Sequence, residues 1–313
     1  MSLKKFSRAV RDSAEAASGK VGLKNPEEKK NAYFLVLPAM IGCFVFTLYP
    51  IIYIFYLSTL SWDLSSSDKR FVGLNNYIRL LQNQEFQQSL SETAVFTFCM
   101  VFISISLALV LAVWLNQKSK VRSFVQTAMF TPYVVSLVAV SILWMWIMDY
   151  DNGLLNFVVV ALGIPKVHWL DSPSTALISL IIIQVWKTLG YNAIILISGL
   201  QSISATLYET AKLDNAGRLT TFFKITVPLL SPSLFFLLII NITSSFQVFD
   251  SINIMTQGGP VNSTNLLVFW IYQTGFEYYN IGDAATGSVF LFLIVGTVTF
   301  LNFKLLNKRV HYQ

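Results

Sequence analysis

The stretch ISATLYETAKLDNAGRLTTFFKITVP, from Ile203 to Pro228, is half polar although it lies between two long apolar segments. Ser204 is a favourable N-cap residue, so the sequence predicts a short helix that begins after it. Pro228 cannot continue a helix without cost, and we expect the chain to change direction there before the next apolar segment. The stretch therefore predicts two short helices joined by a turn, placed between two membrane spans.

The first of these helices has an apolar side, formed by Leu207, Ala211 and Leu213, and a polar side that carries Glu209 and Lys212. A helix this short is not stable alone in water and needs packing against another surface. An apolar side that faces neither lipid nor the protein's own core favours docking to a partner protein. The alternative is a helix that rests on the inner surface of the membrane.

Composition places the whole chain in a membrane. Of its 313 residues, 54% are hydrophobic and only 12% are charged, and the mean hydropathy is +0.59. A soluble domain carries about 25% charged residues. The net charge of +6 does not indicate a nucleic-acid partner, because the basic residues gather where membrane topology requires them.

Six apolar segments are long enough to cross a bilayer, since a helical span needs about 20 apolar residues. Backbone groups in hydrocarbon must bond within their own segment, and these segments do not alternate as the strands of a membrane barrel would. We therefore predict an all-α membrane protein with six transmembrane helices, at 32–60, 93–115, 125–148, 174–198, 227–249 and 283–303. They form one domain, residues 32–306, between a basic segment 1–31 and a tail 307–313.

Lysine and arginine residues predict the orientation of these spans. Of the 22 basic residues, 17 lie in segments on one side of the membrane, 4 lie on the other side, and Lys187 lies within a span. Basic residues accumulate on the cytoplasmic side, which predicts that both termini and the stretch 203–228 are cytoplasmic. Segment 1–31, with eight of these residues, is either a positive-inside anchor or a helix along the inner leaflet.

The stretch 203–228 resembles the EAA loop of permease subunits in bacterial ATP-binding-cassette (ABC) importers. The family pattern is E-A-A-x-x-D-G-A, followed by I-x-x-P, and this chain matches it at Glu209, Ala211, Asp214, Ala216, Ile225 and Pro228. Thr210 replaces an alanine and Asn215 replaces the glycine. Asparagine tolerates left-handed backbone, so we expect the turn to be kept, and Gly217 adds flexibility.

Two further stretches resemble the sugar-importer branch of the same family, which includes maltose and glycerol-3-phosphate permeases. One is FQVFDSINIMTQGGPVNST, Phe246 to Thr264, after the fifth span, and the other is LNNYIRLLQNQEFQQSLSETAVFT, Leu74 to Thr97, before the second. With the span count, the resemblance covers approximately residues 30–306. It implies the type I importer permease fold, with the 203–228 stretch forming a cytoplasmic coupling helix.

The resemblance also implies a mechanism. In the family the loop lies in a cleft of an ATPase subunit, and closure of two ATPase subunits rocks two permease subunits from inward-facing to outward-facing. An extracytoplasmic solute-binding protein then releases a carbohydrate into the opened cavity. By this match, the residues of the ATPase-coupling segment are Glu209, Ala211, Asp214, Asn215, Gly217 and Pro228.

The chain has no G-x-x-x-x-G-K-[ST] phosphate loop, so we expect it to bind no cofactor and to catalyse no reaction. ATP and Mg²⁺ are expected in the partner ATPase subunits. No metal-ligand cluster or catalytic triad is visible in the sequence. The other partners implied by the resemblance are a second, related permease subunit, a binding protein, the carbohydrate and membrane lipid, in a bacterial cell membrane.

Polar residues inside spans are candidate contacts for a transported solute. In the fourth span, Gln184, Lys187, Thr188 and Tyr191 fall within about a 100° arc of a helix, which we expect to face the bundle. In the fifth span, polar and aromatic residues alternate, as suits the hydroxyl groups and C–H faces of a sugar. The predicted pathway residues are Gln184, Lys187, Tyr191, Asn241, Ser245, Phe246 and Asp250.

Structural roles are the alternatives for the same residues. Lys187 could form a structural salt bridge, with Asp250 among its possible partners, or extend its amine toward the interface. Asparagine and serine in spans commonly hydrogen-bond between helices, which gives Asn241 and Ser245 a packing role instead. The sequence leaves both interpretations open.

Three other functions compete with sugar import by an ABC permease. A secondary, ion-coupled transporter commonly shows internal repeats and buried carboxylates, and no Asp or Glu lies in mid-span here. An importer of a non-sugar solute, such as a glycerol phosphate or a polyol, fits the same resemblance. A membrane scaffold without transport activity would not need polar stripes in two spans.

Overall fold

The computed structural model describes residues 26–65, 68–117 and 119–306. The chain divides into two compact units, residues 1–53 and 54–313, and each is treated by itself. Most of the predicted basic segment 1–31, and all of the tail 307–313, lie outside the described residues.

The first unit holds the first predicted span. It runs through α2 (Pro26–Cys43), the π-helical segment η1 (Phe44–Leu48) and the beginning of α3 (Tyr49–Leu57). The span-forming stretch Tyr33–Leu57 is apolar on all sides, and none of its most apolar part is buried. A helix without a polar face is typical of a membrane span, because it has no side suited to water.

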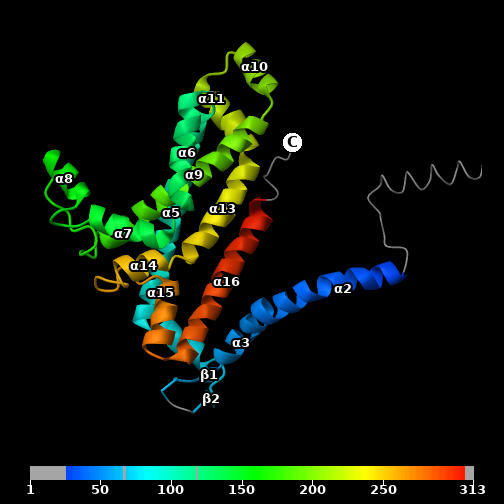
Figure 1. The fold of residues 1–313 in the computed structure, drawn as a ribbon, viewed down its shortest axis with the longest axis vertical. Helices are drawn as coiled ribbons and strands as arrows, with labels where there is room; N and C mark the ends of the chain where they lie inside the picture. The colour runs from blue at the N-terminus through cyan, green and yellow to red at the C-terminus, as the bar shows by residue number, and fades with distance from the viewer. Residues whose placement is uncertain (1–25, 66–67, 118, 307–313) are drawn as a thin grey trace, which may run out of the picture. The chain divides into compact units, whose positions relative to one another are not determined.

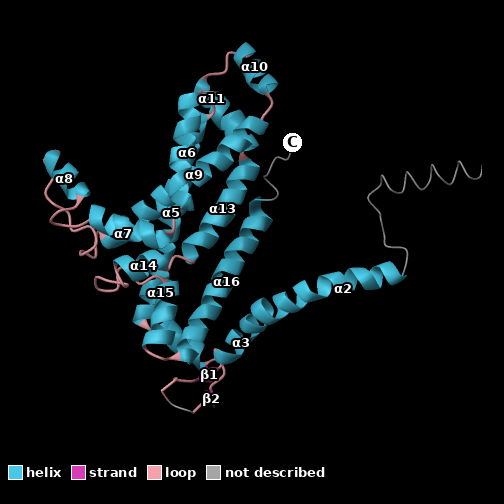
Figure 2. Ribbon diagram, viewed as in Figure 1, coloured by secondary structure: helices cyan, strands magenta, loops and turns pink. Residues whose placement is uncertain are grey.

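The second unit is a helical bundle (Figures 1 and 2). A short hairpin of β1 (Leu60–Ser61) and β2 (Arg70–Phe71) precedes the helices, with Leu60 paired to Phe71 in antiparallel register. The α-helices are α4 (Asn75–Gln82), α5 (Gln84–Leu115), α6 (Lys120–Val134), α7 (Leu137–Ile147), α8 (Leu154–Ala161), α9 (Ala176–Ser202), α10 (Ala205–Leu213), α11 (Arg218–Thr221), α12 (Val227–Leu229), α13 (Ser231–Phe246), α14 (Asp250–Met255), α15 (Leu267–Tyr272) and α16 (Ile281–Leu306). Two π-helical segments, η2 (Phe222–Thr226) and η3 (Gln273–Glu277), join α11 to α12 and follow α15.

The described residues contain five helical stretches that are long and apolar enough to span a membrane, and a sixth if a bent pair counts as one span. Five correspond to the predicted spans, with α5 and α9 running past the predicted ends. The predicted span at 125–148 corresponds to this bent pair and is not a single straight helix. That segment is α6 and α7, bent by 102° relative to each other.

Local chemistry accounts for this bend. Pro132, in the last turn of α6, has no backbone N–H and so removes one helical hydrogen bond. The next residues after the helix, Val135 and Ser136, have extended backbone with ψ of 142° and 136°. Hydropathy remains high across both residues, so composition alone does not separate the two helices.

The core of the bundle is built on α5 and α9. Small residues such as Ala108 and Ala112 on α5 lie against Ala193 and Leu196 on α9 in one buried cluster. At Gly190 the backbones of α9 and α6 approach so closely that an added Cβ would lie 1.8 Å from the carbonyl oxygen of Met129. Small residues permit this kind of close helix packing in membranes. The α10 helix and the β1–β2 hairpin lie at opposite ends of the bundle (Figure 1).

Candidate functional site

The predicted coupling segment forms a short helix at one end of the bundle. Ser204 is the N-cap of α10, and its Oγ accepts a hydrogen bond of 3.4 Å from the backbone N–H of Thr206. Glu209 and Asp214 are exposed, whereas Ala211 is the buried residue of this helix. The predicted helix is therefore confirmed, and it presents its acidic residues to the outside of the bundle.

The turn after α10 is a Schellman motif centred on Asn215. Asn215 has φ of +50°, the left-handed conformation that glycine or asparagine adopts most readily. Its N–H donates to the carbonyl of Lys212 over 3.1 Å, and the N–H of Ala216 donates to the carbonyl of Ala211 over 2.9 Å. The structure thus confirms the expectation that Asn215 can stand in for a glycine here.

A contact between two hydroxyl groups attaches α10 to the bundle. The hydroxyl groups of Tyr208 and Thr226 lie 3.3 Å apart, which joins α10 to η2. Beneath them is a cleft of about 370 Å³ that reaches from α10 and η2 to the last turns of α5 and α9. It is lined by Val113, Asn116, Leu200, Tyr208, Lys212, Ala216, Arg218, Thr221, Phe222 and Thr226. The cleft therefore lies between α10 and the ends of two spans.

Pro228 has a different role from the one predicted. The chain changes direction earlier, between α10 and α11, and Pro228 lies in α12 with helical segments before and after it. The preceding π-helical segment widens the backbone, and the N–H of Val227 reaches the carbonyl of Phe222. Helical structure continues past Pro228 because a proline early in a helix lacks only an N–H that is otherwise unused.

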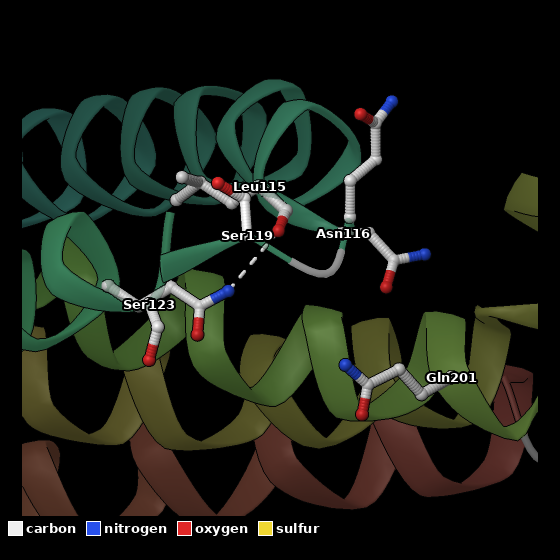
Figure 3. Close-up of a pocket in the computed structure, with 7 residues that line it drawn as sticks. Leu115, Asn116, Ser119, Ser123 and Gln201 are labelled. Carbon is white, nitrogen blue, oxygen red and sulfur yellow. Dashed lines mark hydrogen bonds between the residues drawn. The ribbon is translucent and has the colours of Figure 1, made fainter. Parts of the chain in front are cut away.

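The same end of the bundle holds a second, more polar pocket of about 300 Å³ (Figure 3). It lies between the end of α5, the start of α6 and the end of α9, and six of its seven lining residues carry an amide or a hydroxyl group. Gln126 donates a 3.2 Å hydrogen bond to the carbonyl of Leu115, drawn as the dashed line in Figure 3. The residues around the pocket are Leu115, Asn116, Gln117, Ser119, Ser123, Gln126 and Gln201.

The polar stripe of α9 faces two neighbouring helices: Lys187 and Tyr191 face α6, and Thr188 faces α5. The Nζ of Lys187 donates to the backbone carbonyls of Pro132, Tyr133 and Val135, over 3.1, 3.3 and 2.6 Å. The ring of Tyr191 stacks on that of Tyr133, with centroids 4.4 Å apart. Lys187 and Tyr191 therefore face the end of α6. Among the described residues Lys187 forms no ion pair with Asp250.

Buried amides and hydroxyls join α5, α9 and α13. Asn192 donates to the Oγ of Ser104 over 2.7 Å, and it exchanges two hydrogen bonds with Asn241. The hydroxyl group of Ser104 also lies 3.1 Å from that of Thr188. Ser245, farther along α13, donates to Thr97 on α5. These contacts are of the kind that the helix-packing alternative describes.

The other predicted pathway residues lie in separate surroundings. Gln184 is buried, and its Oε1 has no hydrogen-bond partner. Phe246 lines an apolar cleft of about 520 Å³ between α5, α13 and α16. Asp250 begins α14 and is exposed. The structure does not bring the seven predicted residues to a single site.

Sequence reasoning missed Asn192 and its partner Ser104, and it missed Thr97, the partner of Ser245. A signal for Asn192 was present, since it lies four residues after Thr188 and so on the same side of α9. Nothing comparable identified the two hydroxyl residues of α5, because serine and threonine can satisfy themselves on their own helix. Their partners are known only once three helices are packed together.

Comparison with known proteins agrees with this architecture. Residues 78–312 match the family described as "Binding-protein-dependent transport system inner membrane component". The sn-glycerol-3-phosphate transport system permease protein UgpA of Agrobacterium fabrum is 34% identical over 281 residues, 90% of this chain and 96% of UgpA. The trehalose/maltose transport system permease protein MalF of Thermococcus litoralis is 34% identical over 280 residues, 88% of this chain and 94% of MalF.

Solved structures share the fold. A chain of a bacterial ABC transporter involved in the import of the acidic polysaccharide alginate superimposes with a TM-score of 0.78 and 21% identity, over 90% of this chain and 96% of that one. The same transporter in complex with an alginate pentasaccharide-bound periplasmic protein gives a TM-score of 0.77 and 21% identity, over 88% of this chain and 93% of that one. The predicted all-α importer permease fold is thus confirmed. This chain belongs to the family of inner membrane components of binding-protein-dependent transport systems.

Proposed function

We propose that this chain forms one half of the transmembrane pathway of an ATP-driven importer for a sugar or oligosaccharide. The observation that carries the proposal is the match of residues 78–312 to the permease family. Two similar proteins transport different polar solutes, sn-glycerol 3-phosphate in one case and trehalose or maltose in the other. A glycerol phosphate or a polyol is therefore the second candidate solute.

The exposed end of α10 is proposed to dock on an ATPase subunit. Three large apolar side chains, Leu213, Leu219 and Phe223, are exposed there although they lie outside the predicted spans. Glu209 and Asp214 lie on the same short segment and offer charged contacts. An apolar patch rimmed by charges is typical of a protein interface. The docked partner supplies ATP and Mg²⁺ chemistry, and this chain supplies none.

Force would pass from α10 into the bundle through its buried attachments. The Tyr208–Thr226 contact joins the helix to η2, next to the ends of α5 and α9, and Ala211 of the same helix is buried. A rigid movement of the ATPase subunits would then tilt spans that line the pathway. This arrangement requires α10 on the cytoplasmic side, in agreement with the bias of basic residues, and both termini on that side as well.

Because this chain supplies only half of the pathway, we expect further partner proteins. A second, related permease subunit completes the pathway, and an extracytoplasmic binding protein delivers the solute at the β1–β2 end. Of the predicted solute contacts, Gln184 keeps a free buried acceptor, while Asn241 and Ser245 take part in helix contacts. The complete set of seven stays a prediction.

Co-purification followed by uptake measurements tests the proposal. The tagged chain, expressed in its native cell, is expected to bring down an ATPase subunit and a second permease. Cells that lack the chain are then assayed with labelled maltose, trehalose and sn-glycerol 3-phosphate, and loss of uptake of one of them identifies the solute class. Ion-gradient-driven uptake by this chain reconstituted alone would instead show a secondary transporter.

A further inference from the structure

The bend between α6 and α7 leaves backbone carbonyls without helical partners. The last carbonyls of any α-helix have no N–H partner within that helix. In the hydrocarbon part of a membrane, water does not replace such missing bonds. Val135 donates its N–H to the carbonyl of Thr131, which satisfies one of them. The carbonyls of Pro132 and Tyr133, and that of Val135 beyond the helix, need other donors.

Lys187 supplies those donors. Its ammonium group has three N–H bonds and accepts none, and it donates to three carbonyls, those of Pro132, Tyr133 and Val135. No donor is left for a solute hydroxyl. A positive charge at this place also complements the negative end of the α6 dipole. The contact thus compensates both the half-buried amine and the free carbonyls.

Other residues of α9 also hold this helix against the bend, next to Lys187. Gly190, almost one turn farther along α9, lets the α6 backbone approach to contact distance. Tyr191 stacks on Tyr133 on the same side. Beyond the bend, Trp144 of α7 meets Trp186 of α9 edge to face, with ring centroids 5.5 Å apart. One segment of α9 therefore contacts both arms of the broken span.

We infer that Lys187 is a positioning residue that caps the broken end of α6 and fixes the direction of α7, and that it is not a solute ligand. This role does not depend on which solute is imported. It belongs to the resting bundle, so its loss changes the protein before any solute binds. A residue whose only task is to contact solute would leave the solute-free protein unchanged.

Hydrogen exchange of the solute-free importer tests this assignment. The chain, purified with its partner subunits in lipid nanodiscs without solute or nucleotide, is compared with Lys187→Met by mass spectrometry. Exchange of the amides in 130–142, the end of α6 and the start of α7, is expected to rise at least about tenfold, because a capped helix end frays when its cap is lost. Exchange at the rate of the unmodified chain would overturn the assignment.

Three further variants make the result specific. Lys187→Arg keeps the charge and the donors and is expected to retain the protection of the unmodified chain. Lys304→Met removes one positive charge from the exposed end of α16 and is expected to change nothing in 130–142. If Lys187→Met fails to assemble, Lys187→Gln, which keeps two donors on a shorter side chain, must show the faster exchange. Equal exchange in Lys187→Gln and the unmodified chain would refute the inference.

Discussion

The side-chain amides of Asn192 on α9 and Asn241 on α13 exchange two hydrogen bonds, of 3.1 and 3.0 Å, inside the helix bundle. Asn241 also donates to the carbonyl of Leu237, and Asn192 donates to Ser104 on α5. Three spans are thereby held in one register by groups that water does not reach. In a membrane, where lipid tails are as apolar as leucine, such bonds specify which helix faces belong together.

The loss of stability on removing both of these amides should be smaller than the sum of the losses on removing each one alone. Asn192→Leu leaves buried polar atoms of Asn241 and Ser104 unpaired, at an expected loss of about 1–3 kcal/mol. The double variant with Asn241→Leu should lose less than the sum of the single variants, by about 0.5–1.5 kcal/mol. Unfolding of the purified complex in bicelles measures all three values.

Asn302→Leu is the matched control, because within the described part of the chain the Asn302 amide bonds only to Val298 on its own helix. Its effect on unfolding should be smaller than that of Asn192→Leu. Strict additivity of the two substitutions at 192 and 241 would show that the observed pair contributes no coupling.

The left-handed turn at Asn215 should distinguish glycine from β-branched residues. Asn215→Gly is expected to leave α10 intact, whereas Asn215→Val places a branched side chain at positive φ, at a cost of about 1–2 kcal/mol. Hydrogen exchange of the amides in 205–217 should be roughly tenfold faster in the valine variant. Thr220→Val, at an exposed helical position, serves as the control, and an equal effect there would contradict the role of the turn.

Two glycines of the spans should respond in opposite ways to an added methyl group. Gly190→Ala forces α6 and α9 apart, and overpacking of this kind costs about 1–3 kcal/mol or more. Gly296→Ala meets no atom within 4 Å and gains helix propensity, so its stability should be equal or up to about 1 kcal/mol higher. The prediction is tested by comparing the melting temperatures of the two purified variant complexes with each other. Equal melting temperatures would mean that α6 and α9 are not in close contact.

Charge reversal on α10 should uncouple ATP hydrolysis from transport without disturbing the bundle. Glu209 is exposed, so Glu209→Lys is expected to express and assemble normally. Uptake should fall at least about tenfold, the effect of losing a charge-assisted contact worth roughly 1.4 kcal/mol or more. The readouts are solute uptake and ATPase rate, measured together. Lys304→Glu, a charge reversal at an exposed position near the end of α16, should leave both readouts unchanged.

Much of this fold could be predicted because its signals are local. Long apolar runs identify spans wherever the chain is continuous, and Ser204 and Asn215 mark the two ends of α10 by their preferences for capping and for left-handed backbone. The short helix α10 was predicted for this reason.

The remainder depends on contacts between distant segments. Pro132 is a local signal for a bend in the third span, but neither it nor hydropathy gives the 102° angle between α6 and α7. The acceptors of Lys187 are backbone carbonyls. Every residue has one, so the sequence does not show which of them lie near Lys187. The partners of Asn241 depend on the relative rotation of α5, α9 and α13, which periodicity within one span does not determine.

The central claim is that α10 touches an ATPase subunit. Leu213, with 83% of its surface exposed, offers a cross-linking position on this helix, once Cys43 and Cys99 are replaced by serine. A photoreactive cross-linker attached to Leu213→Cys, activated in native membranes, is expected to yield one main adduct, between this chain and an ATPase subunit. Adducts with phospholipid alone, or labelling of this cysteine by a membrane-impermeant reagent added outside intact cells, would contradict the account.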